Sequence, residues 1–184
     1  MRRPTAAAFI DPNRLCVANR GSGSLSVVDL RARSVREEVT VGGRLVALAV
    51  LPDRKHLLAA DEERNEVVVL AAEGPAVRVR CRVAVGPNPV SVAVSADGRR
   101  ATVACLWSRR LDVLDLTPLP AAPRPLHVLE LPFAPRAQCV LPGGALVVAD
   151  AFGGRLATVD AGAGRVLAVR DLEGHNIRGL AVSA

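Results

Sequence analysis

The stretch "VGPNPVSVAVSADGRRATVACLWSRRLDVLDL", from Val85 to Leu116, contains three short apolar runs separated by turn-like segments. The runs are VSVAVS, ATVACL and RLDVLDL, and their β-branched residues favour extended strands. The segment ADGR, between the first two runs, is typical of a tight hairpin connection in which glycine adopts a positive φ. The stretch therefore predicts three consecutive antiparallel strands.

These runs recur along the whole chain. The second run has equivalents that begin at Leu15, Leu57, Thr102 and Leu146, at intervals of 42 to 45 residues. The first and third runs recur with it, and a fourth run precedes each new copy. No apolar pattern with a period of about 3.6 residues extends over a helical length. Four short strands every ~40–45 residues are typical of propeller blades. The predicted fold is an all-β propeller of four-stranded antiparallel blades.

The repeat units define one propeller domain. They span approximately residues 5–43, 44–87, 88–133 and 134–175, and a further unit starts at 176–184. Most runs carry apolar residues on both faces, which is expected when each sheet lies between two neighbours.

Several residues of the opening stretch resemble one propeller family. Val85, Gly86 and Pro89 match the start of a unit of the YVTN-repeat β-propellers of bacterial and archaeal surface and periplasmic proteins. Asp97-Gly98 match its turn, "CVAN" (Cys16–Asn19) is nearest to the YVTN strand, and "VVD" (Val27–Asp29) matches the closing strand. The tyrosine of the motif is missing in every unit, and only the first unit keeps the asparagine. The resemblance implies a periplasmic or extracellular location.

The family resemblance also implies a ring of about seven blades, whereas about four units are present here. The chain is therefore expected to be an incomplete part of a larger propeller, or an open arc. Open terminal blades would expose apolar faces and strand edges, so we expect self-association or dependence on further sequence. The first residues contain no apolar run long enough for a secretory signal, so a cytoplasmic location stays open. No run approaches the roughly 18 apolar residues that a membrane span needs.

Composition narrows the choice of partner. The formal net charge is +6 and the pI is about 10.3, which raises the question of nucleic-acid binding. The arginines are spread along the chain, Lys55 is the only lysine, and aromatic residues make up 2%. Platforms for base stacking are therefore nearly absent, and nucleic acid is not an expected partner. The four cysteines form no CxxC pair, which predicts free buried thiols and no cofactor or metal.

Candidate binding residues lie in two sets of loops. The loops between the second and third strands, and those between a fourth strand and the next first strand, are expected to share one face. The candidates on this face are Arg20, Arg44, Arg64, Trp107, Arg109, Arg136, Asp150, His175, Asn176 and Arg178. An arginine-rich rim suits a protein loop or a small anionic ligand, because guanidinium groups pair with carboxylates and phosphates. Ordinary solvated turns are the alternative.

Two short segments contain side chains that could support chemistry. "GHNIRG" (Gly174–Gly179) places His175 where the "GPNP" loop has Pro87, and aligns Asn176 with Asn88. A histidine without a second ligand at fixed spacing is more typical of a structural role than of a metal site. "DEERNE" (Asp61–Glu66) lacks the EF-hand arrangement and is interpreted as a charged hairpin loop.

Two functions remain open from the sequence. The first is a non-catalytic interaction module that binds through its loops and has no catalytic residues. The second is a fragment of a propeller enzyme, either a cytochrome-associated oxidoreductase or a lactonase-like hydrolase. Its cofactor or catalytic residues would then lie largely outside this chain.

Overall fold

The computed structural model describes residues 1–182, which form four four-stranded sheets. The first sheet contains β1 (Pro4–Asp11), β2 (Arg14–Asn19), β3 (Ser24–Asp29) and β4 (Ser34–Thr40). The second contains β5 (Leu45–Val50), β6 (His56–Asp61), β7 (Glu66–Glu73) and β8 (Ala76–Ala84). The third contains β9 (Pro89–Val94), β10 (Arg100–Cys105), β11 (Arg110–Asp115) and β12 (Arg124–Glu130). The fourth contains β13 (Pro135–Val140), β14 (Leu146–Asp150), β15 (Arg155–Asp160) and β16 (Arg165–Asp171).

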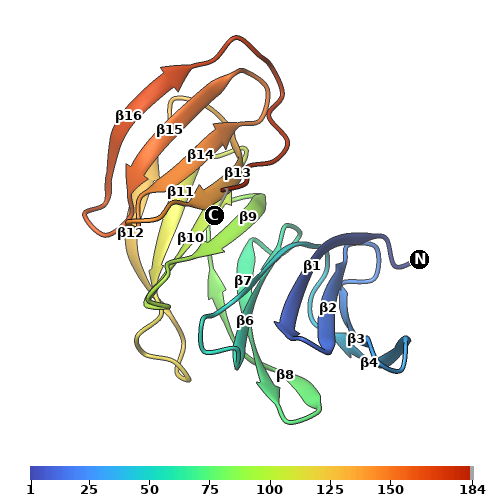
Figure 1. Cartoon of the computed structure of the whole chain (residues 1–184). Coiled ribbons are helices and arrows are strands. Elements are labelled where there is room, and N and C mark those ends of the chain that lie inside the picture. Colours follow the sequence, from blue (N-terminus) through green and yellow to red (C-terminus); the bar gives the residue numbers. More distant parts are fainter. Residues whose placement is uncertain (183–184) are drawn as a thin grey trace.

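Each sheet is an antiparallel meander in which every strand pairs with its neighbours in the chain (Figure 1). The predicted all-β fold with four-stranded blades is thereby confirmed. The turns contain the expected glycines: Gly98 has a φ of 70° and Gly143 a φ of 95°, conformations that a side chain disfavours. We number the sheets as blades one to four in chain order.

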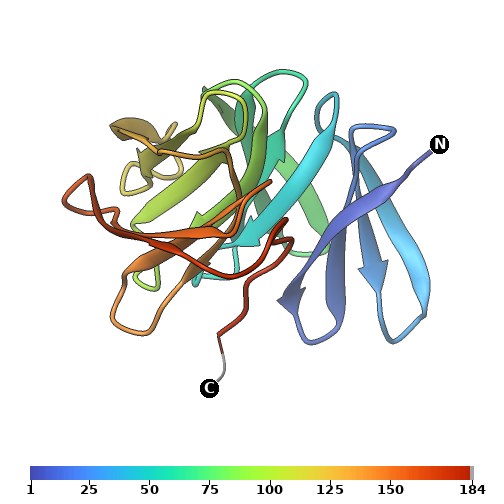
Figure 2. The same cartoon turned by 90° about the horizontal axis from the view of Figure 1, so that it is seen from above.

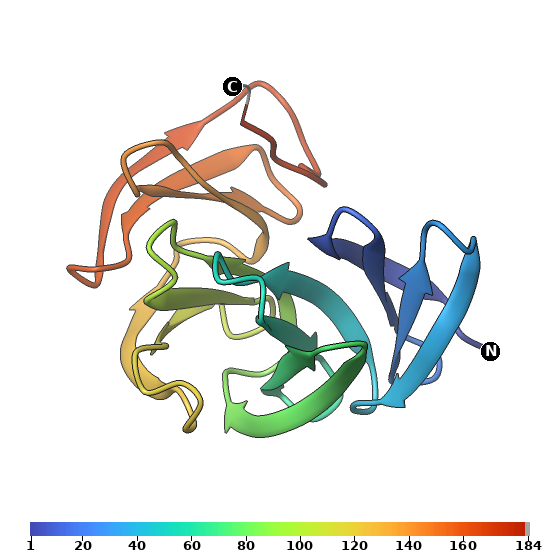
Figure 3. The ribbon, with the colours of Figure 1, turned by 60° about the horizontal axis from the view of Figure 1, so that its bottom comes forward.

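The blades lie side by side in an arc, as Figures 2 and 3 show. The first strand of each blade is its inner strand: β1 lies beside β5, β5 beside β9, and β9 beside β13. The fourth strand of each blade lies on the outside, and its residues are mostly exposed in β4 and β16. The N-terminal blade and the C-terminal blade form the two ends of the arc.

The apolar core consists of three seams between consecutive blades. Cys16, Leu25 and Val27 of blade one meet Leu57 and Leu70 of blade two. The seam between blades two and three joins, among others, Leu58, Val67 and Val69 to Ala101, Val103 and Leu114. The seam between blades three and four joins Leu111 and Val113 to Leu146, Val148 and Val159. Because successive side chains of a strand point to opposite faces, both faces of an inner blade are apolar and buried.

The C-terminal residues depart from the predicted repeat, and the four cysteines differ in burial. The next unit was expected to start at 176–184; residues 172–182 form no strand, and residues 183–184 lie outside the described part of the chain. Cys16 and Cys105 are fully buried, and burial raises the pKa of both thiols to about 12. Cys81 and Cys139 are only partly buried. Residues 1–182 include no helix long and apolar enough to cross a membrane.

Candidate functional site

The two predicted sets of loops do lie on one face, which we call the loop face. Each loop between a second and a third strand accepts a backbone hydrogen bond from the end of the same blade's fourth strand. Val41 N–H donates to Gly23 O (3.0 Å), Val85 N–H to Asn65 O (2.9 Å) and Leu131 N–H to Arg109 O (2.7 Å). Leu172 N–H donates to Gly154 O (2.8 Å) in the last blade. The same bond in all four blades shows that these loops occupy equivalent positions.

A buried carboxylate fastens the loop face in blade two. Asp61, at the end of β6, accepts hydrogen bonds from the backbone N–H groups of Gly43 (2.6 Å) and Arg44 (3.0 Å) in the preceding loop. It also accepts bonds from Glu63 (3.0 Å) and Arg64 (3.3 Å) in its own loop. Burial raises the pKa of Asp61, but these donors outweigh it, so its pKa lies below the usual value. Asp61 therefore ties two loops together.

The preceding loop approaches Asp61 so closely that a side chain would not fit there. A Cβ on Gly42 would lie 2.1 Å from Asp61 Oδ2. The approach brings the Gly43 and Arg44 amides within reach of the carboxylate. Gly42 is thus part of the structural joint.

Blade three builds the same joint from a different strand. Cys105 stands at the position of Asp61, because it pairs with the first residue of the next strand as Asp61 does. The carboxylate comes instead from Asp112 of β11, whose Oδ2 accepts from Gly86 N–H (2.5 Å) and from Arg110 Nη2 (3.1 Å). Arg110 Nε lies 2.9 Å from Asp112 Oδ1 but is not aligned for a hydrogen bond.

Blade four uses Asp150, one of the predicted binding residues. Its side chain is 3% exposed and accepts from Arg155 Nε (3.0 Å) and from Phe152 N–H (3.1 Å). Burial raises the pKa of Asp150, but its hydrogen bonds and the Arg155 charge outweigh that effect and lower it. Asp150 thus holds its own loop and presents almost no surface to a ligand.

A groove crosses the inner part of the loop face. It has a volume of about 460 Å³ and is lined by residues of all four blades, from Thr5 in blade one to Arg136 in blade four. Three of the predicted residues, Arg20, Trp107 and Arg136, line it together. Arg20 is engaged there by an ion pair with Glu62, a residue of the next blade. Only part of the predicted set of binding residues therefore lines this groove.

A second, adjoining groove of about 320 Å³ lies between blades three and four. The predicted Trp107, Arg109 and Asp150 line it, together with Phe133, Phe152 and Arg155. Trp107 and Phe152 are 67% and 57% exposed and stack with their ring centroids 6.1 Å apart. The Arg155 guanidinium lies over the buried Phe133 ring, 5.3 Å from its centroid.

Phe152 is a residue that sequence reasoning missed. It follows the last residue of β14 by two positions, as Trp107 follows Cys105 in blade three. Both aromatic residues thus stand at the same place in neighbouring repeat units. Aligning the loops as closely as the strands would have found the pair.

The other predicted arginines lie farther out. Arg44 pairs with Glu63 (3.1 Å) and lines a shallow hollow with Arg3 and Arg20. Arg64 is exposed and lines none of the three grooves on this face. These positions do not join the aromatic pair.

His175, Asn176 and Arg178 lie in the exposed C-terminal segment and line none of those grooves. Asn176 N–H donates to Phe152 O (3.3 Å), which places the segment beside the loop face. Asn176 and Asn88 have φ values of 58° and 57°, in agreement with the alignment of "GHN" with "GPN". His175 is therefore at a loop position and away from the central groove.

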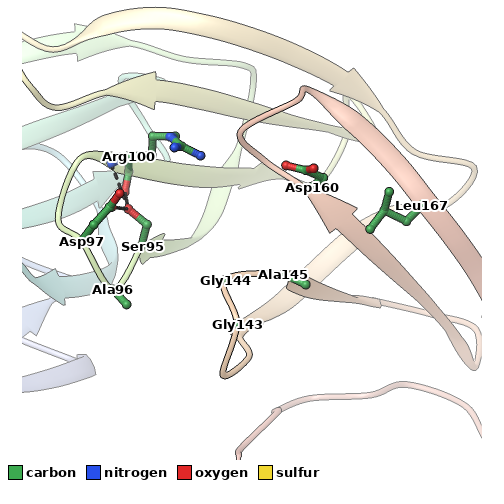
Figure 4. A pocket seen from close by; sticks show the side chains of 9 residues that line it. All are labelled: Ser95, Ala96, Asp97, Arg100, Gly143, Gly144, Ala145, Asp160 and Leu167. Carbon is green, nitrogen blue, oxygen red and sulfur yellow. Dashed lines mark hydrogen bonds between the residues drawn. The ribbon is translucent and has the colours of Figure 1, made fainter.

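The opposite face has a broad depression of about 640 Å³ between blades three and four (Figure 4). Ser95, Asp97 and Arg100 line one side, and Asp160 and Leu167 the other. Asp97 accepts from Ser95 Oγ (2.5 Å) and Arg99 N–H (3.0 Å), which completes a hairpin turn. These contacts explain Asp97 as a turn residue. Within residues 1–182, no three His, Cys, Asp or Glu side chains are grouped so that they could hold a metal ion.

No protein-family model matches this chain, and no curated protein matches it either. Solved β-propeller structures do match. The chain is 25% identical to Kuenenia stuttgartiensis hydrazine synthase, with a TM-score of 0.82 over 94% of this chain and 50% of that one. The periplasmic gluconolactonase PpgL of Pseudomonas aeruginosa is 19% identical, with a TM-score of 0.80 over 96% of this chain and 54% of that one. The Myceliophteria thermophila Swd1 β-propeller domain is 14% identical, with a TM-score of 0.79 over 96% and 57% of the two chains.

The chain therefore spans about half the length of the structures it matches. The likeness in fold covers nearly all of the chain, and it extends to two enzymes and to the Swd1 propeller domain. Taken with the four blades, these matches assign the chain to the β-propeller fold as a partial propeller.

Proposed function

We propose that this chain is a non-catalytic propeller module of the YVTN-repeat kind, which binds a carboxylate- or phosphate-bearing ligand on its loop face. The observation that carries the proposal is the exposed Trp107–Phe152 pair, which lines one groove with Arg109, while Trp107 also lines the adjoining groove with Arg136. An exposed aromatic pair offers apolar contact area at low entropic cost, and an arginine beside it adds charge-assisted hydrogen bonds. The family resemblance supports an extracytoplasmic location for such a module.

The charges of the loop face favour an anion. Arg20, Arg44 and Arg155 each pair with a carboxylate of this chain. In contrast, neither Arg109 nor Arg136 has a carboxylate within 4.0 Å among residues 1–182. Both side chains are exposed, so their charges remain available to a ligand. The ligand is either a small anion or an acidic segment of a protein.

The chain contains a single tryptophan, so its fluorescence reports on the proposed site directly. Titration with citrate, with inorganic phosphate and with a peptide of alternating Glu and Phe residues would separate small anions from acidic peptides. We expect at least one probe to shift the Trp107 emission with saturation. In Arg136→Glu, that probe should bind about 10–100-fold more weakly, because a charge-assisted hydrogen bond contributes about 1.5–3 kcal/mol.

The matched control is Arg165→Glu, an exposed arginine at the start of β16. This variant makes the same change of net charge, and its affinity for the probe should stay close to that of the wild type. If both variants lose affinity equally, the interaction is a general charge effect and the proposed site is wrong. The same conclusion follows if none of the three probes changes the emission.

A second candidate is a piece of a larger propeller enzyme, which the matches to a gluconolactonase and to hydrazine synthase favour. In that case the loops of this chain would form one part of an active site, and residues outside this chain would form the rest. Elemental analysis and a visible spectrum of the purified protein, with an assay of δ-lactone hydrolysis, test this candidate. Stoichiometric metal, a haem Soret band or lactone turnover would support it over a plain binding module.

A further inference from the structure

The seams between blades repeat the same rows of residues. In blade two, Val50, Leu57, Leu70 and Val79 pair across the four strands and face blade one. In blade four, the equivalent row is Val140, Leu146, Val159 and Val166, and it faces blade three. Each row is therefore the surface by which a blade packs on the blade before it.

Blade one carries the same row with no blade packed against it. Phe9 pairs with Leu15, Leu15 with Val28, and Val28 with Val35, so that an apolar stripe crosses all four strands. Phe9 is 60% exposed and Val35 is 48% exposed, whereas Leu57 and Leu70 at the inner positions of blade two are fully buried. We call this stripe the leading face.

Blade four shows the complementary surface. Its Val147, Leu156 and Thr158 are only partly buried, whereas their equivalents in blade one, Cys16, Leu25 and Val27, are fully buried in the first seam. We call this surface, together with Leu172, the trailing face.

Leu172 gives the sharpest contrast. It makes the same backbone hydrogen bond as Val41 and Leu131, which directly follow the fourth strands of blades one and three. Those two side chains are 1% and 5% exposed, because the next blade covers them, whereas Leu172 is 48% exposed. A single chain thus has both halves of a seam that it forms three times internally.

We propose that two copies of this chain associate head to tail, the trailing face of each packing on the leading face of the other. Two identical seams related by a twofold axis along the propeller axis would close a ring from two arcs. The complementarity of the two faces supports a second copy as the occupant, since the leading and trailing faces repeat the two sides of the seams that join consecutive blades within the chain. This proposal rests on the blade faces and is independent of the ligand proposed for the loop face.

Sedimentation equilibrium of the purified chain, from about 1 to about 100 µM, measures the association directly. We expect a dimer at the upper end of this range. Phe9→Asp and Leu172→Asp each place a charge in both seams, so either variant should weaken dimerisation about 100-fold or more. Both side chains are exposed in the single chain, so neither substitution should disturb the fold, which circular dichroism would check.

Val128→Asp is the matched control, because Val128 is 57% exposed on the outer strand β12 and lies on neither terminal face. It should dimerise like the wild type. A mixture of Phe9→Asp and Leu172→Asp should associate more strongly than either variant alone, since one unaltered seam can form between them.

Three results would overturn the proposal. A wild-type chain that stays monomeric over the whole range would exclude a second copy as the occupant of these faces. A Leu172→Asp protein that dimerises normally would indicate contact between two leading faces instead. Polydisperse aggregates that persist in both Asp variants would indicate association through open strand edges. Titration of the Trp107 emission in the monomeric variants keeps the loop-face proposal testable in each case.

Discussion

At the scale of single residues, one position shows how the loop face is held. The last residue of the second strand is Asn19, Asp61, Cys105 and Asp150 in the four blades. Asn19 Nδ2 donates to Ser26 Oγ (2.8 Å), and Asp61 and Asp150 accept backbone N–H groups. The thiol of Cys105 cannot play this part, and Asp112 on the neighbouring strand takes it over. In blades two, three and four a carboxylate thus accepts loop amides at this joint, whereas in blade one Asn19 bonds serine side chains instead. Backbone amides that are withdrawn from water need such acceptors.

Asp61→Asn tests this joint. The amide replaces a charged acceptor and brings donors toward backbone N–H groups, so we expect a loss of about 2–4 kcal/mol in the free energy of unfolding. Asp115→Asn is the control, since Asp115 is part of an exposed turn with Thr117 and should change stability little. Chemical denaturation measures both. An equal loss of unfolding free energy in the two variants would show that the Asp61 hydrogen bonds stabilise the fold no more than those of an exposed turn.

The lowered pKa of Asp61 also predicts a pH dependence. A carboxyl whose pKa is lower in the folded than in the unfolded state stabilises the fold above its unfolded pKa of about 3.9. That contribution is lost as pH falls through the lower folded pKa. The difference in unfolding free energy between the wild type and Asp61→Asn should therefore shrink below about pH 4. A difference that stays constant down to pH 2 to 3 would contradict a role for the ionised carboxylate.

At the scale of elements, the blade is a unit that cannot bury its faces alone. Leu57 and Leu15 occupy the same position in the second strands of blades two and one. Leu57 is fully buried in the first seam, whereas Leu15 on the leading face is only partly buried. Stability at such a position therefore depends on the neighbouring blade more than on the strand that carries the residue.

Leu57→Ala and Leu15→Ala measure that dependence with the same chemical change. In the Leu172→Asp background, which should remain monomeric, Leu57→Ala should cost about 3 kcal/mol through lost burial and a residual cavity. Leu15→Ala should cost about 1 kcal/mol, because less of its surface leaves water on folding. Urea unfolding of the two variants gives the comparison. A Leu15→Ala cost as large as that of Leu57→Ala would mean that the leading face is covered in the monomer.

At the scale of the whole molecule, the core clusters of the described residues lie in seams between consecutive blades. The C-terminal blade and the N-terminal blade are the ends of this arc, and each has a seam face of the kind that is buried inside the arc. An assembly that covers these faces would add burial without any change within the blades. Its stability would then depend on protein concentration.

The melting temperature should report this dependence. For the wild type we expect an increase of about 4 °C over a hundredfold rise in concentration, because association favours only the folded chain. Leu172→Asp should melt at the same temperature throughout that range. Differential scanning fluorimetry or calorimetry at several concentrations would show it. Identical curves for the wild type and this variant would argue against association of the folded chain.

The sequence predicted which loops share one face of the molecule. It did not predict which side chains on that face contact one another. The spacing of the runs placed Arg20, Trp107 and Arg136 in loops of one face, and the structure brings these three to one groove. Asp150 was predicted to bind a ligand, whereas it is buried against Arg155. Phe152, which was not predicted, stacks on Trp107. The surroundings of both residues depend on contacts between different strands or blades, which the spacing of the runs does not contain.

The amino-acid sequence alone determined the four-stranded repeat, its turns and the all-β fold, because alternation and repeat spacing are local properties of the chain. Only the tertiary structure decided which polar loop residues fasten the blades, which ones face solvent, and which seam faces stay open at the ends of the arc. Those outcomes depend on how neighbouring blades bury one another's surfaces, and burial is a property of the packed molecule.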